Sequence, residues 1–198
     1  MYSGGNVAQI KGLTEIRWHG RGGQGAVTSA EMVAQAAIAE ERYGQAFPSF
    51  GPERRGAPVL SFLRVSNDKP IRIRAEIITP DHVVVLDPGL LKIANVVAGL
   101  RPNGILILNT MKDAAKLRAD FGFTCRLATV DANTIAREEL GVLITNTTMV
   151  GALLRATGVV DIESVVAPLE KRFGRIADKN IAAMRRAYTE TVVEESQA

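Results

Sequence analysis

Three glycines near the N-terminus have the spacing of a phosphate-binding loop. Gly20, Gly22 and Gly25 fit the pattern G-x-G-x-x-G within IRWHGRGGQGAVTSA. In such loops glycine lets the backbone approach a ligand, and free N–H groups at the start of the next helix attract an anion. The predicted cofactor-binding residues are those of the loop and two hydroxyls shortly after it: Gly20, Arg21, Gly22, Gly23, Gln24, Gly25, Thr28 and Ser29.

The same glycines also fit a purely structural role, in which they make a tight turn and Thr28 or Ser29 caps the helix. Ligand binding gains support from Arg21, whose guanidinium suits a bidentate contact with phosphate. A dinucleotide site needs an acidic residue after the second strand, about 20 residues on, whereas Glu40 and Glu41 end a predicted helix. A P-loop needs a lysine after its last glycine, and alanine follows here. The sequence therefore disfavours both a dinucleotide site and a P-loop.

Residues 43–58 are rich in proline and glycine and are predicted to form a long loop around FPSFGPERRGAPV. Two readings stay open. The loop contacts a partner through its aromatic rings and its arginine pair, or it folds over its own domain with the rings in the core. The residues predicted for contact with a partner or an active site are Phe47, Pro48, Ser49, Phe50, Gly51, Pro52, Glu53, Arg54 and Arg55, with Asn146 and Thr147 before a later helix.

Asp87 and Asn109 each end an apolar run and are expected at the carboxyl edge of a parallel sheet, where ligands usually bind. Helix capping explains both as well. His19 and His82 have no partner at a recognisable catalytic spacing, and Cys125 lies in an apolar run, so all three are expected to be structural. We predict no catalytic residue and no metal ligand in this chain.

Elements of alternating type must position these residues. A strand is predicted at 15–19, a helix at 28–41, and an antiparallel hairpin of 59–65 with 71–77. Apolar strands at 82–87, 104–109 and 125–130 alternate with helices at 89–100, 111–120 and 131–140, and further helices follow at 147–156, 161–173 (kinked by Pro168) and 180–196.

Apolar strands that alternate with helices are typical of buried parallel strands joined by crossovers. We therefore predict an α/β fold. It is a single Rossmann-like domain over residues 15–198 with a mostly parallel sheet, an antiparallel hairpin and a helical C-terminal part. Residues 1–14 are expected to be a disordered lead-in.

The composition excludes several classes of protein. The 198 residues are 46% hydrophobic and 23% charged, and no apolar run approaches the roughly 18 residues of a membrane span. The net charge of +3 includes no block of like charges, so nothing supports nucleic-acid binding. A single cysteine allows neither an internal disulfide nor an iron–sulfur cluster, and no secretory signal is recognisable. A cytoplasmic location is expected.

The two motifs together, RWHGRGGQGAVTSAEM and YGQAFPSFGPERRGAPV, resemble the gamma chain of pyruvate:ferredoxin oxidoreductases and their ketoisovalerate relatives. The resemblance continues through PDHVVVLDPGLL, GILILNT, IAREELG and NTTMVGALLRATG. The related 2-oxoglutarate-type subunits usually carry SYGPEARGG in place of this loop. The resemblance therefore favours the pyruvate or ketoisovalerate branch.

The resemblance implies a reaction that this chain does not perform alone. A 2-oxoacid and coenzyme A (CoA) become acyl-CoA, CO2 and reduced ferredoxin, with thiamine diphosphate, magnesium and iron–sulfur clusters as cofactors. The chain has neither a cysteine array nor the GDG motif with a later asparagine pair that holds thiamine diphosphate. By resemblance, those cofactors belong to separate alpha, beta and delta subunits, and this chain contributes CoA binding and subunit contacts. A purely structural subunit and, less favoured, a stand-alone NAD-binding reductase are the alternatives.

Overall fold

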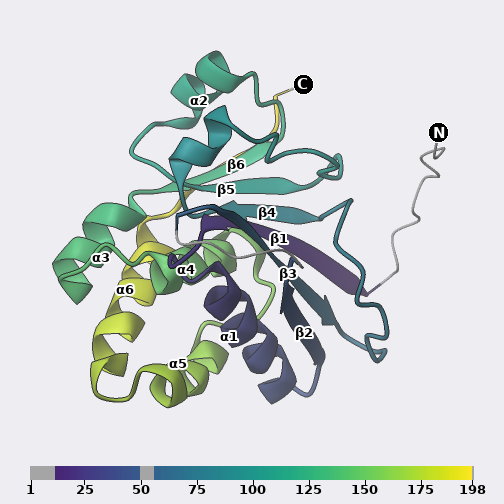
Figure 1. Cartoon of the computed structure of the whole chain (residues 1–198), viewed down its shortest axis with the longest axis vertical. Helices are drawn as coiled ribbons and strands as arrows, with labels where there is room; N and C mark the ends of the chain where they lie inside the picture. The colour runs from purple at the N-terminus through teal and green to yellow at the C-terminus, as the bar shows by residue number, and fades with distance from the viewer. Residues whose placement is uncertain (1–11, 50–55, 198) are drawn as a thin grey trace.

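A seven-stranded sheet in the order β2-β3-β1-β4-β5-β6-β7 forms the centre of the molecule (Figure 1). The structure is a computed structural model that describes residues 12–49 and 56–197. β1, β4, β5 and β6 pair in parallel, whereas β2 with β3, β3 with β1, and β6 with β7 are antiparallel. The strands are β1 (Leu13–Arg21), β2 (Tyr43–Pro48), β3 (Pro58–Ser66), β4 (His82–Val85), β5 (Ile105–Asn109), β6 (Arg126–Val130) and β7 (Val192–Glu194).

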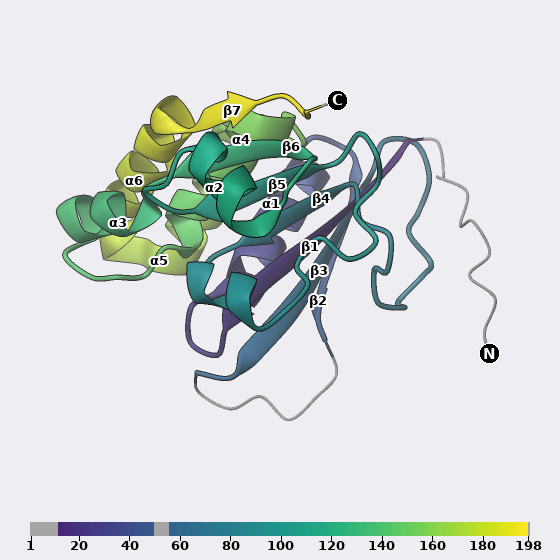
Figure 2. The same ribbon diagram turned by 90° about the horizontal axis from the view of Figure 1, so that it is seen from above.

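Helices cover both faces of the sheet (Figure 2). One layer packs a large apolar core around Ile16 and Trp18 of β1, and the other encloses Val83 and Val85 of β4. The α-helices are α1 (Ala26–Ala39), α2 (Ala114–Phe121), α3 (Ala132–Leu140), α4 (Asn146–Thr157), α5 (Val166–Phe173) and α6 (Ala177–Glu190), and the short 3₁₀ helices are η1 (Pro88–Lys92), η2 (Glu163–Val165) and η3 (Gly174–Ile176).

The predicted fold class is confirmed: the domain is α/β with a parallel centre, antiparallel pairs and a mainly helical C-terminal part. The buried strands β4, β5 and β6 lie where their apolar runs predicted them. β1 begins at Leu13, inside the stretch expected as a lead-in, and continues through Arg21 instead of ending at His19. The first helix begins and ends two residues earlier than predicted, at Ala26 and Ala39.

Two predictions about the antiparallel part are wrong. Residues 43–48 form strand β2 rather than a loop, because β2 pairs with β3 at the sheet edge. An edge strand also tolerates a proline at its end. β3 lies between β2 and β1, which leaves no place beside it for residues 71–77. That segment is irregular, and the Arg64 side chain holds it through the carbonyls of Ile73 and Ala75.

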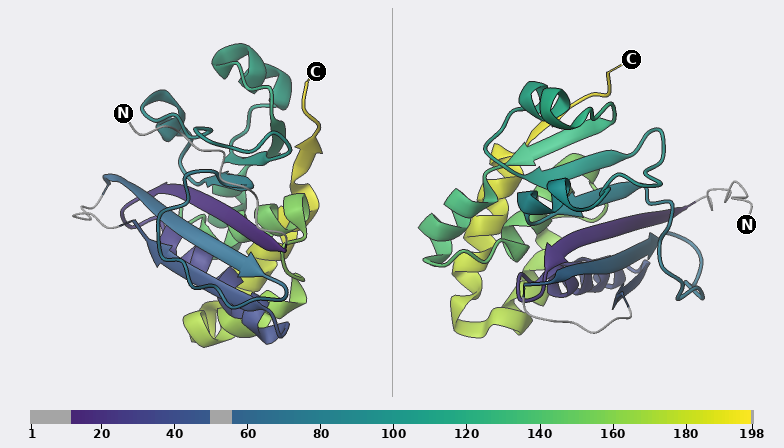
Figure 3. Two further views of the ribbon diagram at one scale, coloured as in Figure 1. Left: turned by 90° about the vertical axis from the view of Figure 1, so that its right-hand side faces the viewer. Right: turned by 45° about the horizontal axis from the view of Figure 1, so that its top comes forward.

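Three predicted helices differ from the observed elements. Residues 89–100 form only the short η1 followed by turns. Pro168 lies in the first turn of α5, where a missing N–H has no consequence, so it makes no kink. The last helix ends at Glu190, and Val192 and Val193 enter strand β7, which runs beside β6 (Figure 3). β-branched valine is suited to a strand.

Candidate functional site

The glycine loop joins β1 to α1 at the carboxyl edge of the sheet. Because Gly20 and Arg21 belong to β1, the loop itself is residues 22–25. Gly23 and Gly25 have φ angles of 93° and 82°, which favour glycine. The Arg21 amide donates to Gln24 Oε1 at 2.8 Å and closes the turn. The chain therefore passes directly from strand to helix, as the glycine spacing predicted.

The N-termini of α1 and α4 meet beside this loop. No side chain caps either helix, so the capping by Thr28 or Ser29 that the purely structural alternative included is not observed. The Ser29 hydroxyl instead lies 3.1 Å from the carbonyls of Gly25 and Asn146. A Cβ at Gly25 would lie 2.9 Å from the Asn146 side chain, so the two helix ends are in close contact. Both helix dipoles favour an anion at this point.

Asn146 and its neighbour Thr147 differ in what they contact. Asn146 is 5% exposed, and its Oδ1 has no hydrogen-bond partner among the described residues. Buried polar atoms nearly always have a partner, so an unpartnered amide oxygen lies where the two helix ends meet. The Thr147 hydroxyl is bonded to Asn180 Oδ1 at 3.0 Å and is fully buried. Of the two predicted residues, only Asn146 therefore lies against the glycine loop.

Arg21 is bound within the protein rather than free in the loop. Its Nε donates to Asp87 Oδ2 at 2.6 Å, and its Nη1 donates to the Gly56 carbonyl at 3.1 Å. Asp87 also accepts from Gln24 at 3.3 Å and from the Gly89 amide at 2.7 Å, so it caps η1. The bidentate phosphate contact expected of Arg21 therefore has a competing carboxylate. The Arg21–Asp87 ion pair ties the end of β1 to the start of η1.

Arg172 is a site residue that the sequence analysis missed. It lies in the last turn of α5, and its Nη2 is 3.5 Å from Thr28 Oγ1 in the first turn of α1. Arg172 is exposed and has no ion pair with any carboxylate that the structure describes. Since 144 residues separate the two side chains, no local pattern signals their contact. Arg172 brings an uncompensated positive charge to the helix end where the dipole already favours anions.

The two sequence motifs meet at this edge. The Gly22 amide donates to the Ala57 carbonyl at 2.9 Å, and the Gly56 amide donates to the Gly22 carbonyl at 3.2 Å. Gly56 and Ala57, which lead into β3, therefore lie beside the glycine loop. Of the residues predicted there, Phe50, Gly51, Pro52, Glu53, Arg54 and Arg55 lie outside the described part of the chain.

Phe47, Pro48 and Ser49 are described. For Phe47, the structure distinguishes contact with a partner from packing in the core of its own domain. It is 6% exposed and packs against Phe62, with ring centroids 5.3 Å apart. Phe47 therefore belongs to its own domain and not to a partner's pocket. Pro48 ends β2, and the Ser49 hydroxyl contacts Glu76 at 2.8 Å.

Asn109 stabilises the carboxyl edge. Its Nδ2 donates to the Leu86 carbonyl at 2.8 Å and to Asn133 Oδ1 at 3.1 Å. These bonds join the ends of β4 and β5 to the start of α3. Asn109 therefore has a structural role at the edge where the sequence predicted it.

The two histidines and the cysteine are partly or fully buried within the protein. Burial, with the charge of Arg17, lowers the pKa of His19 to about 3, and its Nε2 accepts from Arg17 Nε at 3.1 Å. Burial and the charge of Arg126 lower the pKa of His82 to about 4. Burial raises the pKa of Cys125, which packs against the core around β4. Both imidazoles are thus neutral near pH 7, and the cysteine is a thiol.

Within residues 12–49 and 56–197, no three His, Cys, Asp or Glu side chains are placed to share a metal ion. None of the helices in that part of the chain is long and apolar enough to cross a bilayer.

The fold and the site place this protein in the class of open α/β domains that have helices on both faces of the sheet. Its glycine loop lies at the carboxyl edge of the sheet, beside two helix N-termini that no side chain caps. In this sheet the neighbouring strands β1 and β4 are followed by helices on opposite faces, α1 and η1. In open α/β sheets such a point makes a crevice where ligands bind.

The family follows from comparison with known proteins. The model for pyruvate ferredoxin/flavodoxin oxidoreductases matches residues 15–190, and the chain belongs to this family. The common gamma subunit of the pyruvate/ketoisovalerate oxidoreductases of Thermococcus litoralis is 52% identical over 185 residues, which cover 92% of this chain and all of that protein.

Solved structures agree with the fold. The pyruvate oxidoreductase subunit PORC of Thermotoga maritima has a TM-score of 0.84 at 42% identity, over 93% of this chain and 100% of that one. A 2-oxoglutarate:ferredoxin oxidoreductase from Magnetococcus marinus, solved with 2-oxoglutarate, coenzyme A and succinyl-CoA, has a TM-score of 0.72 at 17% identity. The match covers 91% of this chain and 31% of that one, so it shows the shared fold within a longer chain.

Proposed function

We propose that this chain is the gamma subunit of a pyruvate or ketoisovalerate:ferredoxin oxidoreductase and that its share of the reaction is to bind CoA. The complex converts a 2-oxoacid and CoA into acyl-CoA, CO2 and reduced ferredoxin. Membership of the oxidoreductase family and the gamma subunits among its relatives support the first part. The geometry of the carboxyl edge supports the second.

The observation that carries the CoA proposal is the meeting of two uncapped helix N-termini beside Arg172, an arginine without an ion-pair partner among the described residues. CoA bears a pyrophosphate and a 3′-phosphate, which need several N–H donors and positive charge. The N-termini of α1 and α4 provide the donors. Arg172 provides a charge that no described carboxylate neutralises. The Oδ1 of Asn146, which is buried without a partner among the described residues, would accept from a hydroxyl or amide of the ligand.

The remaining cofactors are assigned to other subunits. A [4Fe–4S] cluster takes four cysteine thiolates, and this chain has Cys125 alone. We therefore place the iron–sulfur clusters, thiamine diphosphate and its magnesium in the alpha, beta and delta subunits, with ferredoxin as the acceptor and the cytoplasm as the location of the complex. This chain orders the CoA next to them.

Replacing Arg172 tests the CoA site. In the assembled enzyme, Arg172→Gln removes one charged contact, which is worth about 1.5 kcal/mol or more. We expect the KM for CoA to rise about tenfold, with an unchanged KM for the 2-oxoacid. Calorimetric titration of the assembled enzyme with CoA gives the same comparison without turnover.

Arg155→Gln is the matched control, because Arg155 is also exposed and has no carboxylate partner in the described chain, but lies in the last turn of α4. Equal effects of the two substitutions would contradict a CoA site at the carboxyl edge. No effect of either would favour a purely structural subunit.

The identity of the 2-oxoacid needs its own measurement. We expect the assembled enzyme to reduce ferredoxin with pyruvate or with 2-oxoisovalerate and to form the matching acyl-CoA, identified by mass spectrometry. A preference for 2-oxoglutarate would contradict the proposed branch.

A further inference from the structure

The loop between α3 and α4 exposes three consecutive apolar side chains. Val142, Leu143 and Ile144 are 49%, 61% and 45% exposed, and Ile176 of η3 is 55% exposed. We call these four side chains the apolar patch. Single exposed apolar residues are common on protein surfaces, but a cluster indicates an interaction site.

The apolar patch surrounds a small hollow. Val142, Ile144 and Ile176 line it, with Leu140 and Phe173. Its volume is about 120 Å³, comparable with the roughly 150 Å³ that holds one benzene molecule. The hollow therefore accepts a single apolar side chain.

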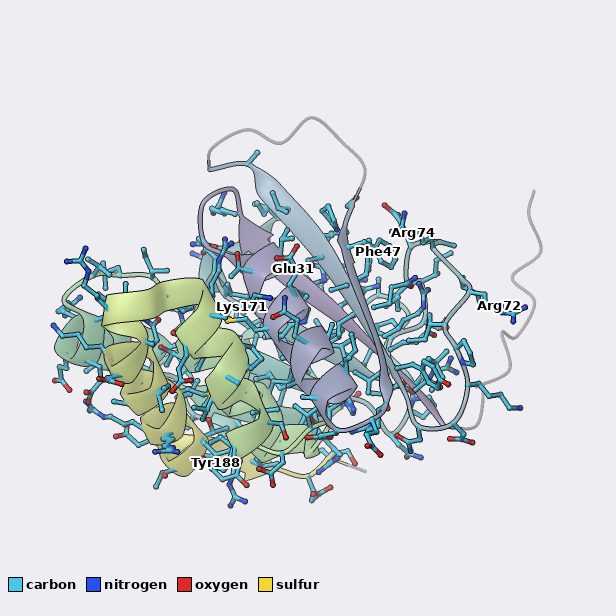
Figure 4. The ribbon with its side chains drawn as sticks, turned by 90° about the horizontal axis from the view of Figure 1, so that it is seen from below. Glu31, Phe47, Arg72, Arg74, Lys171 and Tyr188 are labelled. Atoms are coloured by element: carbon cyan, nitrogen blue, oxygen red, sulfur yellow. The ribbon has the colours of Figure 1, made fainter. Side chains whose placement is uncertain are left out.

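Lys179 lines the hollow, and Arg172 and Arg175 are the sequence neighbours of Phe173 and Ile176, which line it too. Lys171, Arg172, Arg175 and Lys179 are exposed, and none forms an ion pair with a carboxylate in the described part of the chain. We call them the basic rim. Figure 4 shows Lys171 on α5, on the side of that helix that faces α1. A surface with an apolar centre and a basic rim is complementary to an apolar side chain surrounded by carboxylates.

The rim also distinguishes between partners. In a symmetric pair of identical chains the same patch faces itself, so four cations would face four cations. Like charges opposed across an interface are unfavourable. A concave hollow suits an inserted side chain rather than a flat lipid surface. The surface therefore fits a different, acidic protein.

We propose that the apolar patch and the basic rim form the docking surface for another subunit of the oxidoreductase complex. That subunit inserts an apolar side chain into the hollow and places carboxylates against the rim. The identity of the partner rests on the proposed function. Asn146 lines both this hollow and the candidate CoA site, so the docked subunit would close one side of that site.

The test uses the full chain and the other subunits, produced separately. Leu143→Asp introduces a charge at the most exposed side chain of the patch, which is 61% exposed and outside the core. Ile38→Asp is the matched control, because Ile38 is 57% exposed at the far end of α1. We expect Leu143→Asp to weaken assembly at least tenfold, measured by analytical ultracentrifugation, while Ile38→Asp assembles like the wild type.

A second variant keeps the test independent of folding at one position. Lys179→Glu reverses a charge of the rim, and we expect weaker assembly whose dependence on salt is smaller than that of the wild type. Assembly of Leu143→Asp and Lys179→Glu at wild-type affinity would overturn the docking surface and leave the proposed function standing. Failure of the wild-type chain to assemble would overturn both. Binding to anionic vesicles, or a wild-type homodimer that Leu143→Asp dissociates, would assign the patch elsewhere and overturn the inference.

Discussion

Position 25 in the glycine loop requires glycine for two reasons. Its φ of 82° favours glycine, and the space of its missing side chain is taken by Asn146. The positive φ follows from the glycine spacing, which signals a strand–loop–helix junction wherever it occurs between apolar runs, whereas the contact with Asn146 does not. The residues that complete the site carry no such signal. Arg172 approaches Thr28 only because α5 packs beside α1.

Substitutions at Arg21 and Asp87 distinguish two roles of Arg21, a structural ion pair with Asp87 and a contact with the phosphate of CoA. If the Arg21–Asp87 ion pair acts as a cross-link, Arg21→Ala and Asp87→Asn should weaken CoA binding to the same degree and each lower the free energy of unfolding by about 1 kcal/mol. Asparagine keeps the acceptor for the Gly89 amide, so the substitution removes the ion pair and the longer bond from Gln24 to the same oxygen. Calorimetry with CoA and urea denaturation measure the two effects. Tighter CoA binding by Asp87→Asn would show instead that the carboxylate competes with the phosphate for Arg21.

At the scale of elements, the sequence identified buried strands and helices better than edges. Each central strand is a continuous apolar run, which has one good explanation in a sheet covered on both faces. The sequence did not predict strand β2, because Gly44 suggested a loop. Glycine is required at this position because any Cβ there would clash with the Ala34 backbone of α1. Glycine thus marked a close approach of helix and strand.

The wrong hairpin has a similar cause. The segment 71–77 alternates apolar and polar residues, but alternation does not say which strand is the partner. Both edges of β3 were already paired, with β1 and β2. Side-chain hydrogen bonds hold this segment in place of backbone pairing between strands, since Arg64 and Arg17 donate to carbonyls between Ile73 and Ile78.

The packing of α4 on α6 supplies the prediction at this scale. Gly151 of α4 faces the Met184 carbonyl and the Tyr188 amide of α6 so closely that a Cβ would overlap the backbone. We expect Gly151→Ala to lower the free energy of unfolding by about 3 kcal/mol, because the two helices must move apart. Thermal denaturation should show a Tm about 10 °C lower.

Gly158→Ala is the control for that variant. Gly158 ends α4 with a φ of 60° and has open space around it, so alanine there meets only the backbone cost of about 1 kcal/mol. Equal losses from the two substitutions would contradict close packing at Gly151.

At the scale of the whole molecule, the sheet buries charged and titratable groups on the face of β1 opposite α1. Arg17 is 6% exposed, and its guanidinium binds His19 and the carbonyls of two separate segments, at Ile77 and Ile78 and at Val96 and Ala98. A proton on His19 would remove the acceptor and place two positive charges together.

This arrangement predicts a dependence of stability on pH. The pKa of His19 falls from 6.5 to about 3 on folding, so between these values the unfolded chain binds a proton that the folded chain does not. The free energy of unfolding must therefore decrease as the pH falls through this window. His82, with a pKa of about 4, adds to the effect. Urea denaturation from about pH 7 to about pH 5, above the range of ordinary carboxylates, should show the decrease.

His19→Gln should make that decrease shallower, because glutamine still offers an acceptor to Arg17 and takes up no proton. A decrease identical to that of the wild type would mean that other groups cause it.

Strand β7 has a consequence for handling the protein. It pairs antiparallel with β6, and the chain beyond it is held by Arg118 to the Glu195 carbonyl at 2.6 Å and by Gln197 to the Thr124 carbonyl at 3.1 Å. β6 has the sequence RLATV, and without β7 its outer amides and carbonyls would become a template for strands of other molecules. A shortened form that ends at Glu190 would retain the carboxyl edge and α6 but expose a self-associating edge. Proteolytic trimming of these few residues would therefore turn a well-behaved preparation into one that aggregates.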